Sequence, residues 1–201
     1  MITLEARRGQ AADEGAWAAA GLSKSGLTRF VREAQRAVGL AGAVDVLLAN
    51  DKTLRRLNRE FRGKDKATDV LSFPAAEEFA EEFAGDLAIS LETAARQARE
   101  QGHSLRDEVR VLLLHGLLHL SGMDHEVDRG EMEARESELR ERLRLKSGLI
   151  ARAEGAHVAM SPNGRRSRFP CTPTSKLAGD PASGMTTRKA KATAAAKKVK
   201  A

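Results

Sequence analysis

The chain has 201 residues, 41% apolar and 31% charged, which suits one domain with a buried core. Its longest apolar run has about ten residues, well short of the roughly 20 that cross a bilayer, and its single cysteine excludes an internal disulfide. Residues 148–201 hold 11 Lys/Arg and 2 Asp/Glu, whereas residues 1–147 hold 23 and 26, so any polyanion partner needs a local patch or the tail.

The first expected elements alternate between strand and helix. Residues 2–7 alternate apolar and polar side chains, as in a strand, with no apolar stretch typical of a secretory signal. Residues 23–38 place apolar side chains at helical spacing behind a serine cap. A strand is expected at 43–49, and Asp51 can cap a helix that runs through LRRLNREF.

The middle of the chain predicts two further strands and a helix. VLSFP at 70–74 and GDLAIS at 85–90 are β-favouring runs on either side of an acidic loop. SLETAARQAREQ then has helical spacing and stops at Gly102. The chain therefore mixes strands and helices throughout.

A buried helix is predicted over SLRDEVRVLLLHGLLHLSG. Ser104 and Asp107 form a capping box at its start, and Gly122 can end it. Only Arg110 is charged in its apolar part, and a helix that is apolar on every side is a central, buried one.

The end of the chain changes in composition. A charged amphipathic helix over residues 131–146 is expected to cover the surface. Beyond it, residues 148–201 are rich in Ser, Pro, Gly, Thr and Lys, which predicts a basic, disordered tail after a folded domain at 1–147. The tail either contacts the anionic groups of a polyanion partner or serves only as a solubilising extension.

Three of the five histidines lie in HGLLHLSGMDH, residues 115–125. His115 and His119 are four residues apart and share one helix face, and the turn after Gly122 can bring His125 back towards them. One isolated histidine would be a core residue hydrogen-bonded to a carbonyl, but two buried imidazoles with a third nearby are harder to satisfy in that way. The triplet predicts a metal site, and three nitrogens without a thiolate suit zinc with one coordination position left for water.

The spacing HxxxHxxGxxH also matches metzincin proteases, with one change. Gly116 stands where those enzymes have the glutamate that acts as general base, so a metalloprotease-like hydrolase is only an alternative. Gly116 has two readings of its own: close packing of the helix, or space beside the metal for a bulky substrate.

The histidine block, LNREFRGKDKATDVLSFP at 57–74 and GDLAIS at 85–90 together resemble the YbeY family of bacterial endoribonucleases, over about residues 1–150. The resemblance implies an α/β, α+β-like domain with a small, about four-stranded mixed sheet packed by helices, and a central helix carrying the metal ligands. It implies one zinc ion per chain on His115, His119 and His125.

The resemblance also implies a function. The family's activity is that of a cytoplasmic, single-strand-specific, metal-dependent endoribonuclease in 16S rRNA 3′-end maturation and ribosome quality control. The implied partners are rRNA, the small ribosomal subunit and proteins on it, with no membrane. A non-catalytic, zinc-stabilised ribosome-associated factor is the alternative.

One further site residue follows from the family's aromatic-Arg-x-Lys-Asp block. It places a catalytic, RNA-binding arginine at Arg62, whose guanidinium can match two phosphate oxygens, and Lys64 and Lys66 can add to RNA binding. From spacing alone the block is a solvated polar loop, and the resemblance changes that reading for Arg62 only. Ala67 replaces a usual proline and Met123 a common aromatic, which predicts altered loop stiffness and pocket lining without loss of chemistry.

Overall fold

The computed structural model describes residues 1–4, 21–125, 127–145 and 157–158, all within a compact unit formed by Met1–Phe169. The strands are β1 (Ile2–Leu4), β2 (Ala43–Ala49), β3 (Val70–Pro74), β4 (Phe83–Ser90) and β5 (His157–Val158). The helices are α2 (Lys24–Val38), α3 (Asp51–Arg62), α4 (Leu91–Glu100), α5 (Leu105–Leu120) and α6 (Glu131–Arg142), with a 3-10 turn, η1 (Glu77–Phe79).

The strands form one mixed sheet in the order β1-β2-β4-β3-β5. β1, β2 and β4 run parallel, whereas β3 is antiparallel to β4. The four predicted strands are thus present in one sheet packed by helices, and the predicted fold class is confirmed. β5 pairs with β3 in parallel and belongs to the predicted tail, so these two residues differ from the expected disorder. The other residues of 148–201 lie outside the described part.

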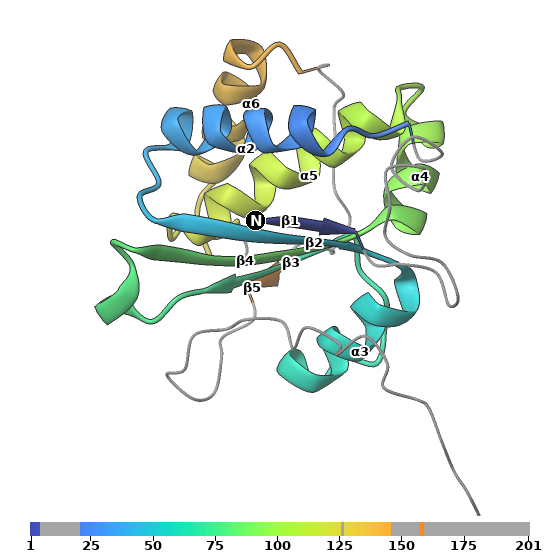
Figure 1. The fold of residues 1–201 in the computed structure, drawn as a ribbon, viewed down its shortest axis with the longest axis horizontal. Helices are drawn as coiled ribbons and strands as arrows, with labels where there is room; N and C mark the ends of the chain where they lie inside the picture. The colour runs from blue at the N-terminus through green and yellow to red at the C-terminus, as the bar shows by residue number, and fades with distance from the viewer. Residues whose placement is uncertain (5–20, 126, 146–156, 159–201) are drawn as a thin grey trace, which may run out of the picture. The chain divides into compact units, whose positions relative to one another are not determined.

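Helices cover the two faces of the sheet unequally (Figure 1). α2, α5 and α6 lie on one face and α3 lies on the other. Strand alternation separates two apolar cores: Leu87 and Ile89 of β4 pack with α5, whereas Ala88 packs with Leu54 and Leu57 of α3. The larger core includes α5, whose residues 111–120 are all buried, so the predicted central helix is confirmed.

The helix ends follow the sequence signals with two exceptions. Ser104 caps α5 as predicted, because its Oγ accepts a hydrogen bond from Asp107 N (3.2 Å). The reciprocal part of the capping box differs: Asp107 Oδ2 accepts from the Ser104 hydroxyl (2.7 Å), whereas a capping box uses the backbone N–H of the cap residue. The cap of α3 is Asn50, whose Oδ1 accepts from Thr53 N (2.9 Å), so the prediction for Asp51 was wrong.

Asp51 instead connects two helices. It begins α3 and accepts a hydrogen bond from Thr93 Oγ1 of α4 (2.7 Å). The second exception is α6, which ends at Arg142 and not at residue 146. Arg144 has a φ of 54°, a left-handed conformation that cannot continue a right-handed helix. No helix in the described ranges is both long and apolar enough to cross a membrane.

Candidate metal centre

The structure brings the three predicted histidines together. His115 and His119 project from one face of α5, are 5% and 1% exposed, and have their Nε2 atoms 3.2 Å apart. After α5, Gly122 takes a left-handed φ of 91°, which glycine adopts at little cost, and the chain turns back. The ring of partly exposed His125 then lies 5.3 Å and 5.1 Å, between centroids, from those of His115 and His119.

The donor set fits a metal ion of the zinc type. One nitrogen from each histidine lies within 4.8 Å of the others. Two nitrogens bound to one tetrahedral zinc at about 2.0–2.1 Å would be about 3.3 Å apart, close to the 3.2 Å between His115 and His119. The buried Nδ1 of His125 has no hydrogen-bond partner among the described residues, so it is a polar atom that a bound ligand could satisfy.

Burial keeps His119 in the form that binds metals. Its pKa is lowered to about 4, chiefly by burial and further by the charges of His115 and His125, against smaller opposite effects of Asp124 and the Met123 backbone. An imidazole must be neutral to coordinate a cation, so His119 is available as a ligand at neutral pH.

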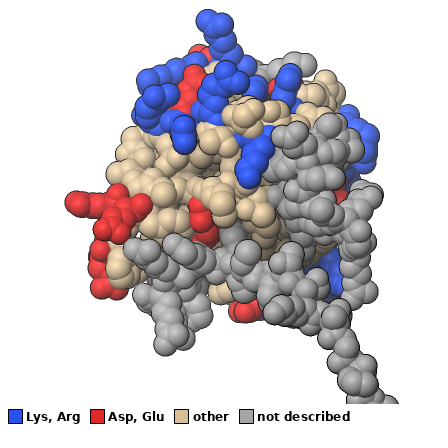
Figure 2. Space-filling model, in the orientation of Figure 1, with Lys and Arg blue, Asp and Glu red and all other residues tan. Residues whose placement is uncertain are grey.

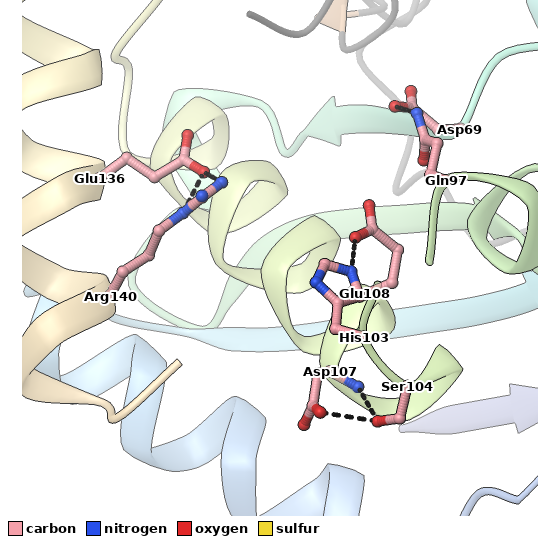
Figure 3. Close-up of polar contacts among 8 residues, drawn as sticks. All are labelled: Asp69, Gln97, His103, Ser104, Asp107, Glu108, Glu136 and Arg140. Carbon is pink, nitrogen blue, oxygen red and sulfur yellow. Dashed lines mark hydrogen bonds and ion pairs between the residues drawn. The ribbon is translucent and has the colours of Figure 1, made fainter. Parts of the chain in front are cut away.

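Two residues of α6 complete the surroundings of His115. The Nδ1 atom of His115 lies 2.7 Å from Oε2 of Glu136. The other carboxylate oxygen, Oε1, accepts a hydrogen bond from Arg140 Nε (3.0 Å), and Figure 3 shows this pair on α6. Both residues are only 8% exposed.

Sequence reasoning missed Glu136 and Arg140, because the charges of this segment indicated a surface helix. The available signal was spacing. Met132, Glu136 and Leu139 follow each other at four and three residues, so Glu136 lies on the apolar face of the helix.

The structure favours packing as the reason for Gly116. A Cβ at this position would lie 2.7 Å from Cδ2 of Leu87 and 3.4 Å from Oγ of Ser72, so Gly116 faces the sheet. The Ser72 hydroxyl also donates to the Gly116 carbonyl (3.4 Å). The glycine therefore allows α5 to approach β3 and β4 closely.

The predicted RNA-binding residues lie at the end of α3 and in the loop that follows it. Arg62 is the last residue of α3 and half-buried, and Lys64 is exposed just beyond it. α3, which ends at Arg62, and α5, which carries His115 and His119, pack on opposite faces of the sheet. Ala67 is partly exposed in the same loop, and Met123 packs at the border of the main core.

The loop after Arg62 is exposed but anchored. Arg55 forms a two-bond ion pair with Asp65 (2.8 Å and 2.7 Å), which lowers the pKa of that carboxyl. Asn58 Nδ2 donates to the Lys66 carbonyl (2.8 Å). These contacts hold the loop against α3 and fix the direction in which its backbone leaves the helix.

Comparison with known proteins gives matches over most of the described chain. The model of the family described as Endoribonuclease YbeY matches residues 20–144. "Endoribonuclease YbeY" of Koribacter versatilis is 56% identical over 133 residues, which cover 66% of this chain and 86% of the relative. Its namesake in Solibacter usitatus is 50% identical over 137 residues, 68% of this chain and 90% of the relative. "Endoribonuclease YBEY, chloroplastic" of Arabidopsis thaliana is 52% identical over 99 residues, 47% of this chain and 17% of the relative.

Proposed function

The chain belongs to the YbeY endoribonuclease family, and from this premise we propose that it is a zinc-dependent endoribonuclease acting on single-stranded RNA. The supporting observation is the cluster of three histidine nitrogens within 4.8 Å. The proposed substrate is rRNA of the small ribosomal subunit, in 16S rRNA 3′-end maturation and ribosome quality control. The proposed location is the cytoplasm, where this substrate is made in bacteria.

His115, His119 and His125 would hold the ion. When bound, zinc would supply a Lewis acid for a phosphoryl oxygen and lower the pKa of a water molecule towards 7. The chain's own contribution is to keep the His119 imidazole neutral through burial, which lowers its pKa, and to exclude water on the α5 side with apolar side chains. Partly exposed His125 marks the side from which RNA would approach.

Arg62 and Lys64 are the proposed phosphate contacts. Support comes from the exposed cations around them on α3 and its loop: Lys52, Arg55, Arg56, Arg59 and Lys66. By contrast, exposed glutamates gather in the segment between β3 and β4 and form the acidic edge visible in Figure 2: Glu77, Glu78, Glu81 and Glu82. Phosphate groups would be attracted to the first region and repelled by the second.

The arrangement of these groups supports a preference for single strands. An RNA that contacts both the histidines of α5 and the exposed cations of α3 must bend around the sheet, because these two helices pack on its opposite faces. A single strand can bend over this distance, whereas a double helix is stiff on the scale of one small domain.

The test is cleavage of single-stranded RNA by the purified chain, together with 3′-end mapping of small-subunit rRNA in cells that carry His119→Ala. We expect zinc-dependent cleavage by the wild type, and unprocessed 3′ ends in the variant. Ribosome association with normal 3′ ends would favour a non-catalytic, zinc-stabilised factor. Casein cleavage that a chelator stops would favour a metalloprotease-like hydrolase.

We also propose that residues 1–147 form the nuclease domain and that the basic tail, 148–201, adds RNA contacts. The tail's 11 Lys/Arg against 2 Asp/Glu support this. A chain ending at Lys146 should then show a smaller salt dependence of RNA binding. An unchanged dependence would leave the tail as a solubilising extension.

A further inference from the structure

We propose that Glu136 is a positioning residue for the metal centre, and that it fixes the proton of His115 on Nδ1. The Nε2 lone pair of His115 then points to the other two histidines. This inference rests on the zinc site of the proposed function, but it does not depend on what the loaded site cleaves.

The first step concerns the contact between the two side chains. Glu136 Oε2 lies 2.7 Å from His115 Nδ1, and an ionised carboxylate can only accept a hydrogen bond. The nitrogen at this position must therefore carry the hydrogen. A neutral imidazole has one N–H, so Nε2 of His115 is left as an acceptor, 3.2 Å from Nε2 of His119.

The second step concerns the charge of Glu136. Arg140 donates from Nε to Oε1 (3.0 Å) and also pairs with this oxygen through Nη2, one turn further along α6. A guanidinium is always charged and stabilises the ionised carboxylate beside it. Both oxygens of Glu136 are thus engaged, one by His115 and one by Arg140.

The third step concerns burial. Glu136 and Arg140 are each 8% exposed, so their charges have lost most of their hydration. A buried ion pair adds little net stability compared with apolar side chains of similar volume. Orientation of a metal ligand is a role that apolar side chains could not fill, because carboxylate partners of ligating histidines fix both the ring and its tautomer.

A second buried histidine–glutamate pair provides a matched control. His103 Nε2 lies 2.5 Å from Glu108 Oε2, with the two side chains 4% and 1% exposed, at the start of α5 (Figure 3). His103 is not part of the histidine cluster. Glu108→Gln therefore changes the same type of buried pair without changing a ligand's partner. Glu138→Gln, which alters an exposed pair with Arg135 on α6, is the surface control.

The first measurement is zinc affinity of the full chain, by competition with a chromophoric chelator. We expect Glu136→Gln to bind zinc roughly 10- to 100-fold more weakly, the usual effect of removing an outer-shell partner. The Glu108→Gln and Glu138→Gln variants should bind as the wild type does. Because Glu136→Gln removes the carboxylate that pairs with Arg140, the double variant Glu136→Gln/Arg140→Met, which removes both charges, should show the same loss if the single variant does not fold.

The second measurement is the tautomer of His115 in the zinc-free chain, from imidazole nitrogen chemical shifts. We expect hydrogen on Nδ1 in the wild type and a mixture of both tautomers in Glu136→Gln. A role in stability alone would change the unfolding midpoint and leave the tautomer unchanged.

The outcomes separate this inference from the proposed function. Wild-type zinc affinity with an unchanged tautomer in Glu136→Gln would overturn the positioning role, while RNA cleavage by the wild type would still stand. Weakened zinc binding in Glu136→Gln, with no RNA cleavage by the zinc-loaded wild type, would support the positioning role and overturn the proposed function. A wild-type chain that binds no zinc would overturn both.

Discussion

The two faces of the sheet carry different kinds of polar chemistry. On the α5 face, His115, His119 and Glu136 are buried among apolar side chains, and His115 lies within hydrogen-bond distance of both other residues (2.7 Å to Glu136 and 3.2 Å to His119). On the α3 face, the cations are exposed along a helix and a loop, and the ion pair of Arg55 with Asp65 lies at the surface.

This difference sets how sensitive each face of the sheet is to substitution. A buried polar group costs free energy unless its partners are in place, so residues on the α5 face depend on one geometry. An exposed charge remains hydrated and contributes mainly through its field, which salt screens. We therefore expect large, all-or-none effects when the buried polar residues of the α5 face are substituted, and graded, salt-dependent effects on the α3 face.

The largest effect is expected from His119→Ala. It removes one of three proposed ligands, so zinc affinity should fall by more than the roughly 10- to 100-fold typical of an outer-shell partner, and RNA cleavage should be lost. Bound metal measured on the purified variant tests this. Wild-type metal content would contradict the ligand assignment and the view that the α5 face is built for one geometry.

The next effect is a loss of stability in acid for the zinc-free chain. Unfolded His119 takes up a proton near pH 6.5, whereas the folded chain does so only near its pKa of about 4. The unfolded state therefore binds more protons between these values, and the free energy of unfolding falls as the pH is lowered through this interval, by at most roughly 3 kcal/mol.

Denaturant unfolding at a series of pH values tests this contribution. His119→Ala is the control, since it should remove this part of the pH dependence. The same slope in both proteins would assign the acid sensitivity to other groups.

A smaller effect is expected from Arg62→Ala on the α3 face. Loss of one charged phosphate contact, worth about 1.5–3 kcal/mol, should lower the rate of RNA cleavage roughly 10- to 100-fold. In a plot of the logarithm of the RNA binding constant against the logarithm of the salt concentration, the slope should become shallower by about one. Zinc content should not change. A variant that lost zinc as well would show that the two faces are coupled.

Lys64→Ala provides the graded comparison. Its side chain is exposed and a lysine makes no two-pronged contact with phosphate, so its loss should weaken RNA binding less than the loss of Arg62. Equal losses would indicate that only the net charge of this face matters.

The smallest effect is expected from Gly116→Ala. The added Cβ would meet the fully buried Leu87 at 2.7 Å, an overpacking cost of about 1–3 kcal/mol, partly offset by a gain of about 1 kcal/mol in helix propensity. We expect a net destabilisation of about 1 kcal/mol by denaturant unfolding and normal zinc affinity. Normal stability with impaired cleavage would restore the alternative in which Gly116 makes room for substrate.

The same contrast explains what could be predicted from the sequence. The central helix and its histidine cluster were predictable, because polar residues inside an apolar run are conspicuous and few arrangements satisfy them. The Ser104 cap of α5 was predictable because it depends only on neighbours along the chain.

Features that depend on distant residues were not predictable. Asn50 and Asp51 are both good helix caps, and the choice between them depends on Thr93 of α4, which engages Asp51. Glu136 carries the same charge as its exposed neighbours in α6, and only the packing of α6 against α5 reveals its partner, His115. The packing of α3 and α5 on opposite faces of the sheet likewise follows from topology and not from a local pattern.

The unequal supports of the three histidines have a kinetic consequence. Two imidazoles belong to the buried helix α5, while the third lies in a short turn after it. Two sets of hydrogen bonds hold this turn. Met123 N–H donates to the Leu118 carbonyl (3.1 Å), and the Asp128 carboxylate accepts from Gly130 N (2.9 Å) and Met132 N (2.8 Å). We expect zinc exchange to proceed by local opening of this turn while α5 stays folded. Asp128→Asn should therefore raise the rate constant of zinc dissociation, measured by stopped flow, by a larger factor than it raises the equilibrium dissociation constant of the zinc complex.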